Sequence, residues 1–163
     1  MERGDDELKS AMCGGHLMRH GEHYAEFEIR HGTDVTTQPG VGLARPQHNL
    51  DDGMFNSACC WVYDTTDGGV FHPDSGSEAT FECEGLDGAE QGDTVGLLLD
   101  LTAGTLTVYR NGKRLGVAVH PELPGVPPLT GPLSWAVEVC DGSAVHIQHG
   151  QPPPPQQQPA TGA

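Results

Sequence analysis

The side chains with the clearest potential for chemistry lie near the N-terminus, where Cys13, His16, His20 and His23 are separated by two or three residues each. Thiolate and imidazole groups at such short spacing can bind Zn²⁺ tetrahedrally. However, His23 begins a segment that reads as a strand, which would hold it away from Cys13. We therefore expect scattered surface histidines, no metal site and no other cofactor.

A second chemical candidate is the carboxylate pair Glu26 and Glu28, which would lie on one face of a strand. Retaining glycosidases use two carboxyl groups about 5–5.5 Å apart. Arg30 and His31 follow in place of a third acid, and no aromatic sugar platform lies nearby in the sequence. The chain also lacks a Ser-His-Asp order, a P-loop and a dinucleotide-binding glycine motif. These observations predict that the protein is not an enzyme.

A third candidate is the acidic segment 49–53 (NLDDG), whose oxygen atoms could hold a hard cation. Calcium loops of this kind, or exposed aromatic side chains, support glycan binding in lectin-like proteins. Carbohydrate or cation binding by a lectin-like domain therefore remains open as an alternative function.

Composition limits the class of protein and of partner. The 163 residues carry a net charge of −15 with only 8 Lys and Arg residues, so the sequence predicts no nucleic-acid partner, because phosphate contacts need clustered basic groups. The five cysteines have no disulfide framework spacing, and Cys59 and Cys60 are adjacent. The acidic N-terminal segment does not read as a signal peptide, and no apolar run is long enough for a membrane span. We expect a soluble intracellular protein, cytoplasmic or nuclear, with no membrane partner.

Between its ends the sequence reads as short strands without a convincing helix. Residues 24–29 alternate strictly, with Tyr24, Glu26 and Glu28 on one face and Ala25, Phe27 and Ile29 on the other. Further strands are expected over residues 41–44, 59–63, 79–83, 95–101, 106–109, 115–119, 134–140 and 143–148. Asn111-Gly112 and Asp141-Gly142 each predict a two-residue hairpin turn. This pattern predicts an all-β fold, an antiparallel two-sheet β-sandwich.

The sequence pattern predicts that the chain has three parts. Residues 1–11 are expected to be a flexible N-terminus, and residues 12–149 a single domain. Residues 150–163 are rich in Pro and Gln and cannot build a core, so we expect a disordered, partly polyproline-II tail. Such a tail could dock an SH3-like or WW-like module.

The ordered motifs resemble those of the SPRY domain family, over about residues 21–147. The most specific part is GDTVGLLLDLTAGTLTVYRNGKRLGVAV (residues 92–119), and GEHYAEFEI, VGLA, WVY and the closing WAVEV and SAVHI fall in the family's order. The resemblance implies a concanavalin-like, jelly-roll type sandwich. It also implies that the family's opening strand is missing or is formed loosely by residues 15–19.

The resemblance also implies a function, because SPRY domains are usually non-catalytic modules that bind peptides or protein surfaces. They often serve as adaptor or substrate-recognition parts of ubiquitin-ligase, chromatin or signalling complexes. Their ligands contact loops at one end of the sandwich. By position, the matching residues here are Arg45, Gln47, His48, Val70, Phe71, His72, Cys140 and Asp141. Arg45 and Phe71 are the expected anchors, since interface hot spots favour Arg and aromatic side chains.

Overall fold

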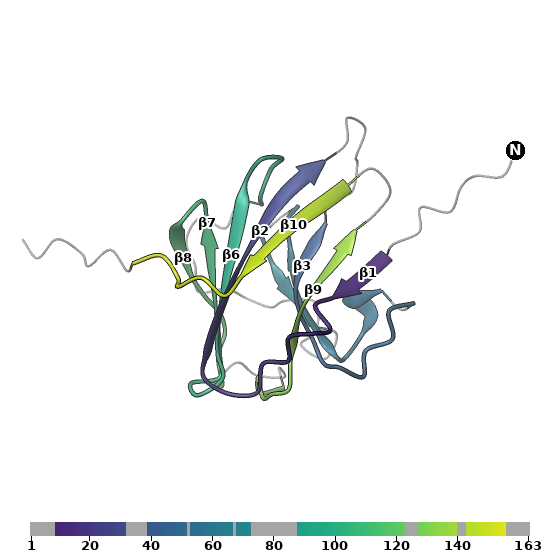
Figure 1. The fold of residues 1–163 in the computed structure, drawn as a ribbon, viewed down its shortest axis with the longest axis vertical. Coiled ribbons are helices and arrows are strands. Elements are labelled where there is room, and N and C mark those ends of the chain that lie inside the picture. The colour runs from purple at the N-terminus through teal and green to yellow at the C-terminus, as the bar shows by residue number, and fades with distance from the viewer. Residues whose placement is uncertain are drawn as a thin grey trace, which may run out of the picture.

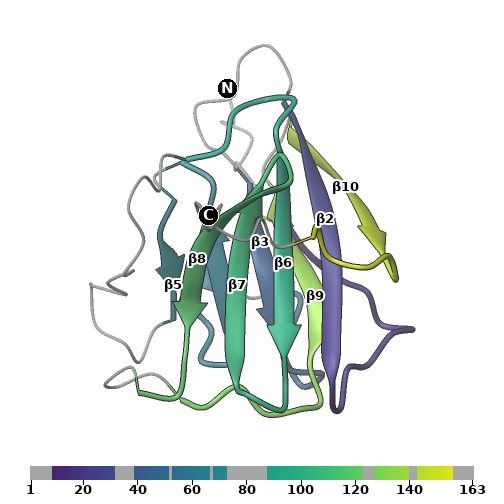
Figure 2. The same cartoon turned by 90° about the vertical axis from the view of Figure 1, so that its left-hand side faces the viewer.

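In the computed structural model, residues 9–31, 39–51, 53–66, 68–72, 88–122, 127–139 and 143–155 are described. They contain ten strands and one 3-10 turn: β1 (Lys9–Met12), β2 (Glu22–His31), β3 (Gly40–Ala44), η1 (Met54–Asn56), β4 (Cys60–Asp64), β5 (Val70–Phe71), β6 (Thr94–Asp100), β7 (Thr105–Arg110), β8 (Lys113–Val119), β9 (Ser134–Val139) and β10 (Ser143–His149). The strands form two antiparallel sheets, in the orders β1-β9-β3-β4-β5 and β10-β2-β6-β7-β8 (Figures 1 and 2). The predicted all-β sandwich is confirmed.

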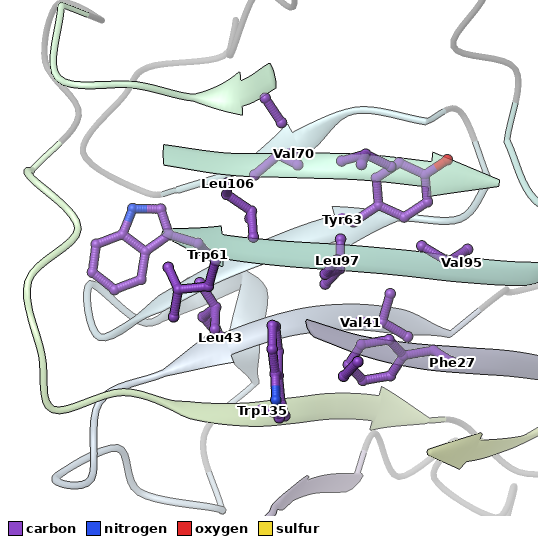
Figure 3. Close-up of a cluster of buried hydrophobic side chains, with 14 of the residues drawn as sticks. Phe27, Val41, Leu43, Trp61, Tyr63, Val70, Val95, Leu97, Leu106 and Trp135 are labelled. Atoms are coloured by element: carbon purple, nitrogen blue, oxygen red, sulfur yellow. The ribbon is translucent and has the colours of Figure 1, made fainter. Parts of the chain in front are cut away.

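The main core lies between the facing surfaces of the two sheets, where apolar side chains interdigitate (Figure 3). Strand β2 contributes Ala25, Phe27 and Ile29, all fully buried, as the alternation of its sequence predicts. The opposite sheet contributes Val41 and Leu43 from β3, also fully buried. Trp61, Tyr63 and Trp135 are buried as well.

Strand β6 occupies the central position that its apolar sequence predicts, between β2 and β7. Its inward side chains, including Val95 and Leu97, are fully buried. On the outer face of the sheet, Tyr24 of β2 and Tyr109 of β7 meet edge to face, with ring centroids 5.7 Å apart. A Cβ at Gly96 would collide with the Tyr24 hydroxyl, so glycine lets the tyrosine ring lie close over the strand.

The hairpin between β7 and β8 closes through Asn111 and Gly112, as predicted. Both residues have positive φ angles, 51° and 80°, which is the backbone conformation of a type I′ turn. The Asn111 side chain adds two contacts across the sheet edge. Its Oδ1 accepts from Thr94 N at 2.9 Å, and its Nδ2 donates to Asp93 at 3.0 Å.

The prediction of a second hairpin around Asp141-Gly142 is wrong, because the two strands that flank this turn do not pair with each other. Strand β9 pairs with β1 and β3 in one sheet, whereas β10 pairs with β2 in the other. The chain therefore crosses from one sheet to the other after Val139 instead of turning back beside β9. Residues 140–142 and the expected strand at 79–83 lie outside the described residues.

The N-terminal edge of the fold also differs from expectation. Its first strand is β1, which begins at Lys9 opposite Val139 and so includes residues that we assigned to a flexible N-terminus. Residues 15–19, where we expected a loose opening strand, contribute only an isolated bridge between Met18 and Leu133. Met18 is fully buried, which fixes this segment against the core. No helix in the described part of the chain is long and apolar enough to cross a membrane.

Replacing Gly42 with Ala should destabilise the domain by about 2–3 kcal/mol or more. Gly42 lies in β3 between two neighbouring strands, and a Cβ there would collide with the backbone carbonyl of Trp61, which cannot rotate away. Urea denaturation followed by circular dichroism measures the change. Gly14→Ala is the matched control, because a Cβ there would have no neighbour within 4 Å. Equal stability of the two variants would contradict the tight packing at β3.

Candidate functional site

Two of the predicted loop residues, Arg45 and His72, contact Trp61 at the end of the sheet where β3 finishes and β4 begins. Arg45 directly follows β3, and its backbone N–H donates to the carbonyl of Cys59 at 2.8 Å. Its guanidinium carbon lies 5.1 Å from the centroid of the Trp61 ring, within cation–π range. Its Nη1 donates to the carbonyl oxygen of Thr130 at 3.0 Å. Arg45 is therefore a partly exposed cation held in one position by a fully buried indole.

His72 reaches the same indole from β5. Its ring centroid lies 5.0 Å from that of Trp61, and its Nε2 lies 3.1 Å from the carbonyl oxygen of Ala58. The imidazole is buried. The structure thus brings together the segment after β3 and the segment at β5 through their shared contact with Trp61.

The other predicted residues after β3 and at β5 differ in accessibility. Gln47 is exposed. His48 is buried, with its Nδ1 3.0 Å from the Ser57 hydroxyl, so it supports the loop from beneath. Val70 is buried in the main core. Phe71 is half-buried and packs on Phe55 with ring centroids 5.9 Å apart.

Cys140 and Asp141 lie outside the described residues. Strand β9, which precedes them, runs antiparallel to β3, with Ser134 opposite Ala44 and Glu138 opposite Gly40. The end of β9 is therefore at the opposite end of the sheet from Arg45. The expected contribution of Cys140 and Asp141 to the binding surface stays a prediction.

Residues 45–51 and 53–59, whose arrangement the sequence did not predict, cross the outer face of the sheet that contains β3; we call them the strap. A second apolar cluster lies beneath the strap and contains Ala44, Met54, Cys60, Val62 and Ala136, with Met12, Phe55 and Cys59 at its margin. Leu50, in the strap, is 45% exposed. The exposed surface of the strap is therefore partly apolar.

Glu138 fastens the strap to the sheet, and sequence reasoning also missed this role. Its Oε2 accepts from the backbone N–H of Met54 at 2.9 Å and of Phe55 at 3.4 Å, at the start of η1. The side chain is only 2% exposed. A lone Glu within the apolar stretch SWAVEV was the available signal, because a buried carboxylate requires hydrogen-bond partners.

Burial dominates the protonation equilibria beneath the strap. It raises the pKa of Glu138, which the two backbone N–H groups and nearby His48 partly oppose. Burial also raises the pKa of the Cys60 thiol to about 12, although a hydrogen bond with Ser57 acts the other way. Cys60 therefore stays a neutral thiol near pH 7, and its packing with apolar neighbours is a structural role.

The histidines of the N-terminal run do not assemble with Cys13 into a metal site. His16 packs against His149 and His23, with ring centroids 5.0 and 5.7 Å apart, and His23 Nε2 bonds to the carbonyl oxygen of His20 at 2.9 Å. Burial raises the pKa of Cys13, which disfavours the thiolate that a metal needs. Within the described ranges, no three His, Cys, Asp or Glu side chains have a metal-binding arrangement.

Glu26 and Glu28 line a small hollow of about 30 Å³ on the outer face of the other sheet, together with Thr94, His146 and Gln148. The space suits water molecules and is too small for a sugar ring. Tyr24 donates to Glu26 at 3.1 Å, and Arg30 donates to Glu28 at 3.0 Å. The hydrogen bond from Arg30 lowers the pKa of Glu28, which is opposite to what a general acid needs.

Comparisons with known proteins agree with this architecture. The SPRY domain family model matches residues 22–131. Among solved structures, the SPRY domain of human HERC1 is similar, with a TM-score of 0.64 and 18% sequence identity over 86% of this chain and 80% of that chain. At this identity the likeness concerns the fold alone. A search of curated proteins found no match.

The Glu138→Gln variant should gain stability relative to the wild type as pH rises from about 4.5 towards neutrality. The amide keeps an oxygen that can accept from Met54 N and Phe55 N but carries no charge. Because the folded-state pKa of Glu138 is raised above its ordinary value of 4.5, the group stabilises the wild type fully below that value, and this contribution is lost as pH rises through the folded pKa. Urea denaturation across this range measures the difference.

The matched control is Glu138→Ala, which removes the acceptor and leaves buried N–H groups unsatisfied. It should be about 1–3 kcal/mol less stable than Glu138→Gln at every pH, because neither variant titrates at this position. If the free energies of unfolding of the Gln variant and the wild type differed by the same amount at every pH, the proposed cost of the buried charge would be contradicted.

Proposed function

The chain belongs to the SPRY domain family, and we propose that it is a non-catalytic protein-interaction module that captures a peptide or protein surface. The proposed surface is the end of the sandwich where the strap begins at Arg45, which we call the strap end. The family is generally one of protein-interaction modules. We choose this surface because of the contact between Arg45 and Trp61. It holds a partly exposed guanidinium against a buried ring, and Gln47 and Leu50 of the same strap are exposed.

This arrangement suits binding because little has to be ordered when a partner arrives. Arg side chains lose about 2 kcal/mol of rotamer freedom when they are fixed, and here the ring of Trp61 and the carbonyl of Thr130 already restrict Arg45. A guanidinium has five N–H donors, so those not bonded to Thr130 can donate to carbonyl or carboxylate oxygens of a peptide. Exposed Leu50, also in the strap, offers an apolar contact.

The net charge of the whole chain also affects which partners bind. With a net charge of −15, the domain attracts partners that carry basic residues outside the contact itself. We infer a peptide that presents an oxygen acceptor and an apolar side chain to the strap end, within a basic surrounding sequence.

The wider role that fits is that of an adaptor or substrate-recognition domain in an intracellular assembly, such as a ubiquitin-ligase, chromatin or signalling complex. The free thiols of Cys13, Cys59 and Cys60 support a reducing compartment, the cytoplasm or nucleus.

Arg45→Ala should weaken binding of a captured partner by about tenfold to a hundredfold, as expected for a hot-spot arginine. A partner is first isolated from lysate with the 163-residue chain and identified, and its affinity is then measured by isothermal titration calorimetry. Arg114→Ala is the matched control, since it removes an exposed guanidinium from β8 in the other sheet. Circular dichroism verifies that both variants are folded.

A photo-crosslinking residue at exposed Gln47, compared with one at exposed Lys113, gives a second readout that leaves Arg45 intact. Crosslinking from position 47 alone would support the strap end. Crosslinking from position 113 alone, or equal affinity of the wild type and Arg45→Ala, would overturn the assignment of the surface.

A further inference from the structure

The last described segment carries four consecutive prolines, Pro152–Pro155, which follow Gly150 and Gln151. Each proline fixes φ near −65° and lacks a backbone N–H group, so the run cannot extend a sheet or form a helix. In the structure, residues 151–155 have neither strand nor helix assignment. Such a run adopts the polyproline-II conformation, whose carbonyl groups point outward without internal partners.

The fold presents this segment away from its core. Strand β10 is the edge strand of its sheet and pairs only with β2. Gly150 then has a φ of 88°, a left-handed conformation that turns the chain at the end of the strand. Figure 1 shows residues 150–155 leading away from the end of β10. Pro152 and Pro155 are exposed, and neither described apolar cluster includes a residue of this segment.

We propose that Pro152–Pro155 is a second interaction site, which binds a polyproline-recognition domain with an aromatic-lined groove. In such grooves, proline rings pack between aromatic side chains, and side-chain donors bond to the outward carbonyls. Because each proline ring fixes φ, this conformation is favoured before a partner binds, and binding has little left to order. A four-proline run whose two ends, Pro152 and Pro155, are exposed and whose middle is half-buried has the features that this recognition mode requires.

The charge of the residues around Pro152–Pro155 favours some polyproline-recognition domains over others. No Asp, Glu, Lys or Arg occurs between residues 150 and 163, whereas the whole chain carries a net charge of −15. SH3 grooves commonly pair acidic residues with an Arg or Lys beside the prolines. That cation is absent here, and the like charge of the domain would oppose an acidic groove. The partner is therefore a groove that reads prolines without a charged neighbour, as WW-type domains and profilin do.

The second site is independent of the strap end. The tail leaves from β10, whereas Arg45 and His72 adjoin strands of the opposite sheet. One chain could therefore hold two partners at once, and each would raise the effective concentration of the other.

The test titrates the full chain with purified profilin and with a WW domain, and uses an SH3 domain for comparison. Isothermal titration calorimetry gives the affinities. Replacing all four residues Pro152–Pro155 with Ala should weaken profilin or WW binding by at least about tenfold. The matched control replaces Gln156, Gln157 and Gln158 with Ala and should change the affinity by less than about twofold. Arg45→Ala should bind like the wild type, which separates this site from the strap end.

A fluorescence readout complements the calorimetry, because Trp61 and Trp135 of this chain are fully buried. Quenching on mixing then reports the tryptophan of the partner's groove. The proposal is overturned if neither profilin nor the WW domain binds the wild type at about 1 mM. It is also overturned if the four-alanine variant binds as tightly as the wild type, or if the SH3 domain alone binds.

Discussion

Phe27 of β2 and Trp135 of β9 meet edge to face between the two sheets, with ring centroids 5.9 Å apart and both side chains fully buried. Strand pairing joins strands within each sheet, so contacts of this kind are what hold one sheet against the other. Full burial of one large apolar side chain contributes about 1.5–3 kcal/mol. The loops at both ends of the sandwich keep their positions because this packing fixes the sheets from which they leave.

Trp61 extends that packing to the surface. Its ring belongs to the core, yet Arg45 and His72 lie against it at the end of the sheet. The position of the guanidinium is therefore coupled to the core and not to a mobile loop. A module that binds a partner on a preformed surface needs this coupling, because each ordered side chain otherwise subtracts from the affinity.

The strap shows how a buried charge can organise a loop. Glu138 sits in a strand whose other described side chains are mostly apolar, and it accepts two backbone hydrogen bonds from residues 84 and 83 positions earlier in the chain. The carboxylate costs free energy to bury, and the two N–H groups offset part of that cost. In return, Met54 is held over the second apolar cluster and Phe55 at its margin.

Local physics determined much of this protein in advance. Side-chain alternation has a period of two in any strand, so residues 24–29 alone predicted which side chains face the core. The two positive φ angles of a type I′ turn made Asn111-Gly112 a reliable hairpin, and the order of such motifs identified the family. Only the tertiary structure decided that β9 and β10 join different sheets and that Glu138 holds the strap. These outcomes depend on contacts between residues far apart in sequence, whose partners no local pattern specifies.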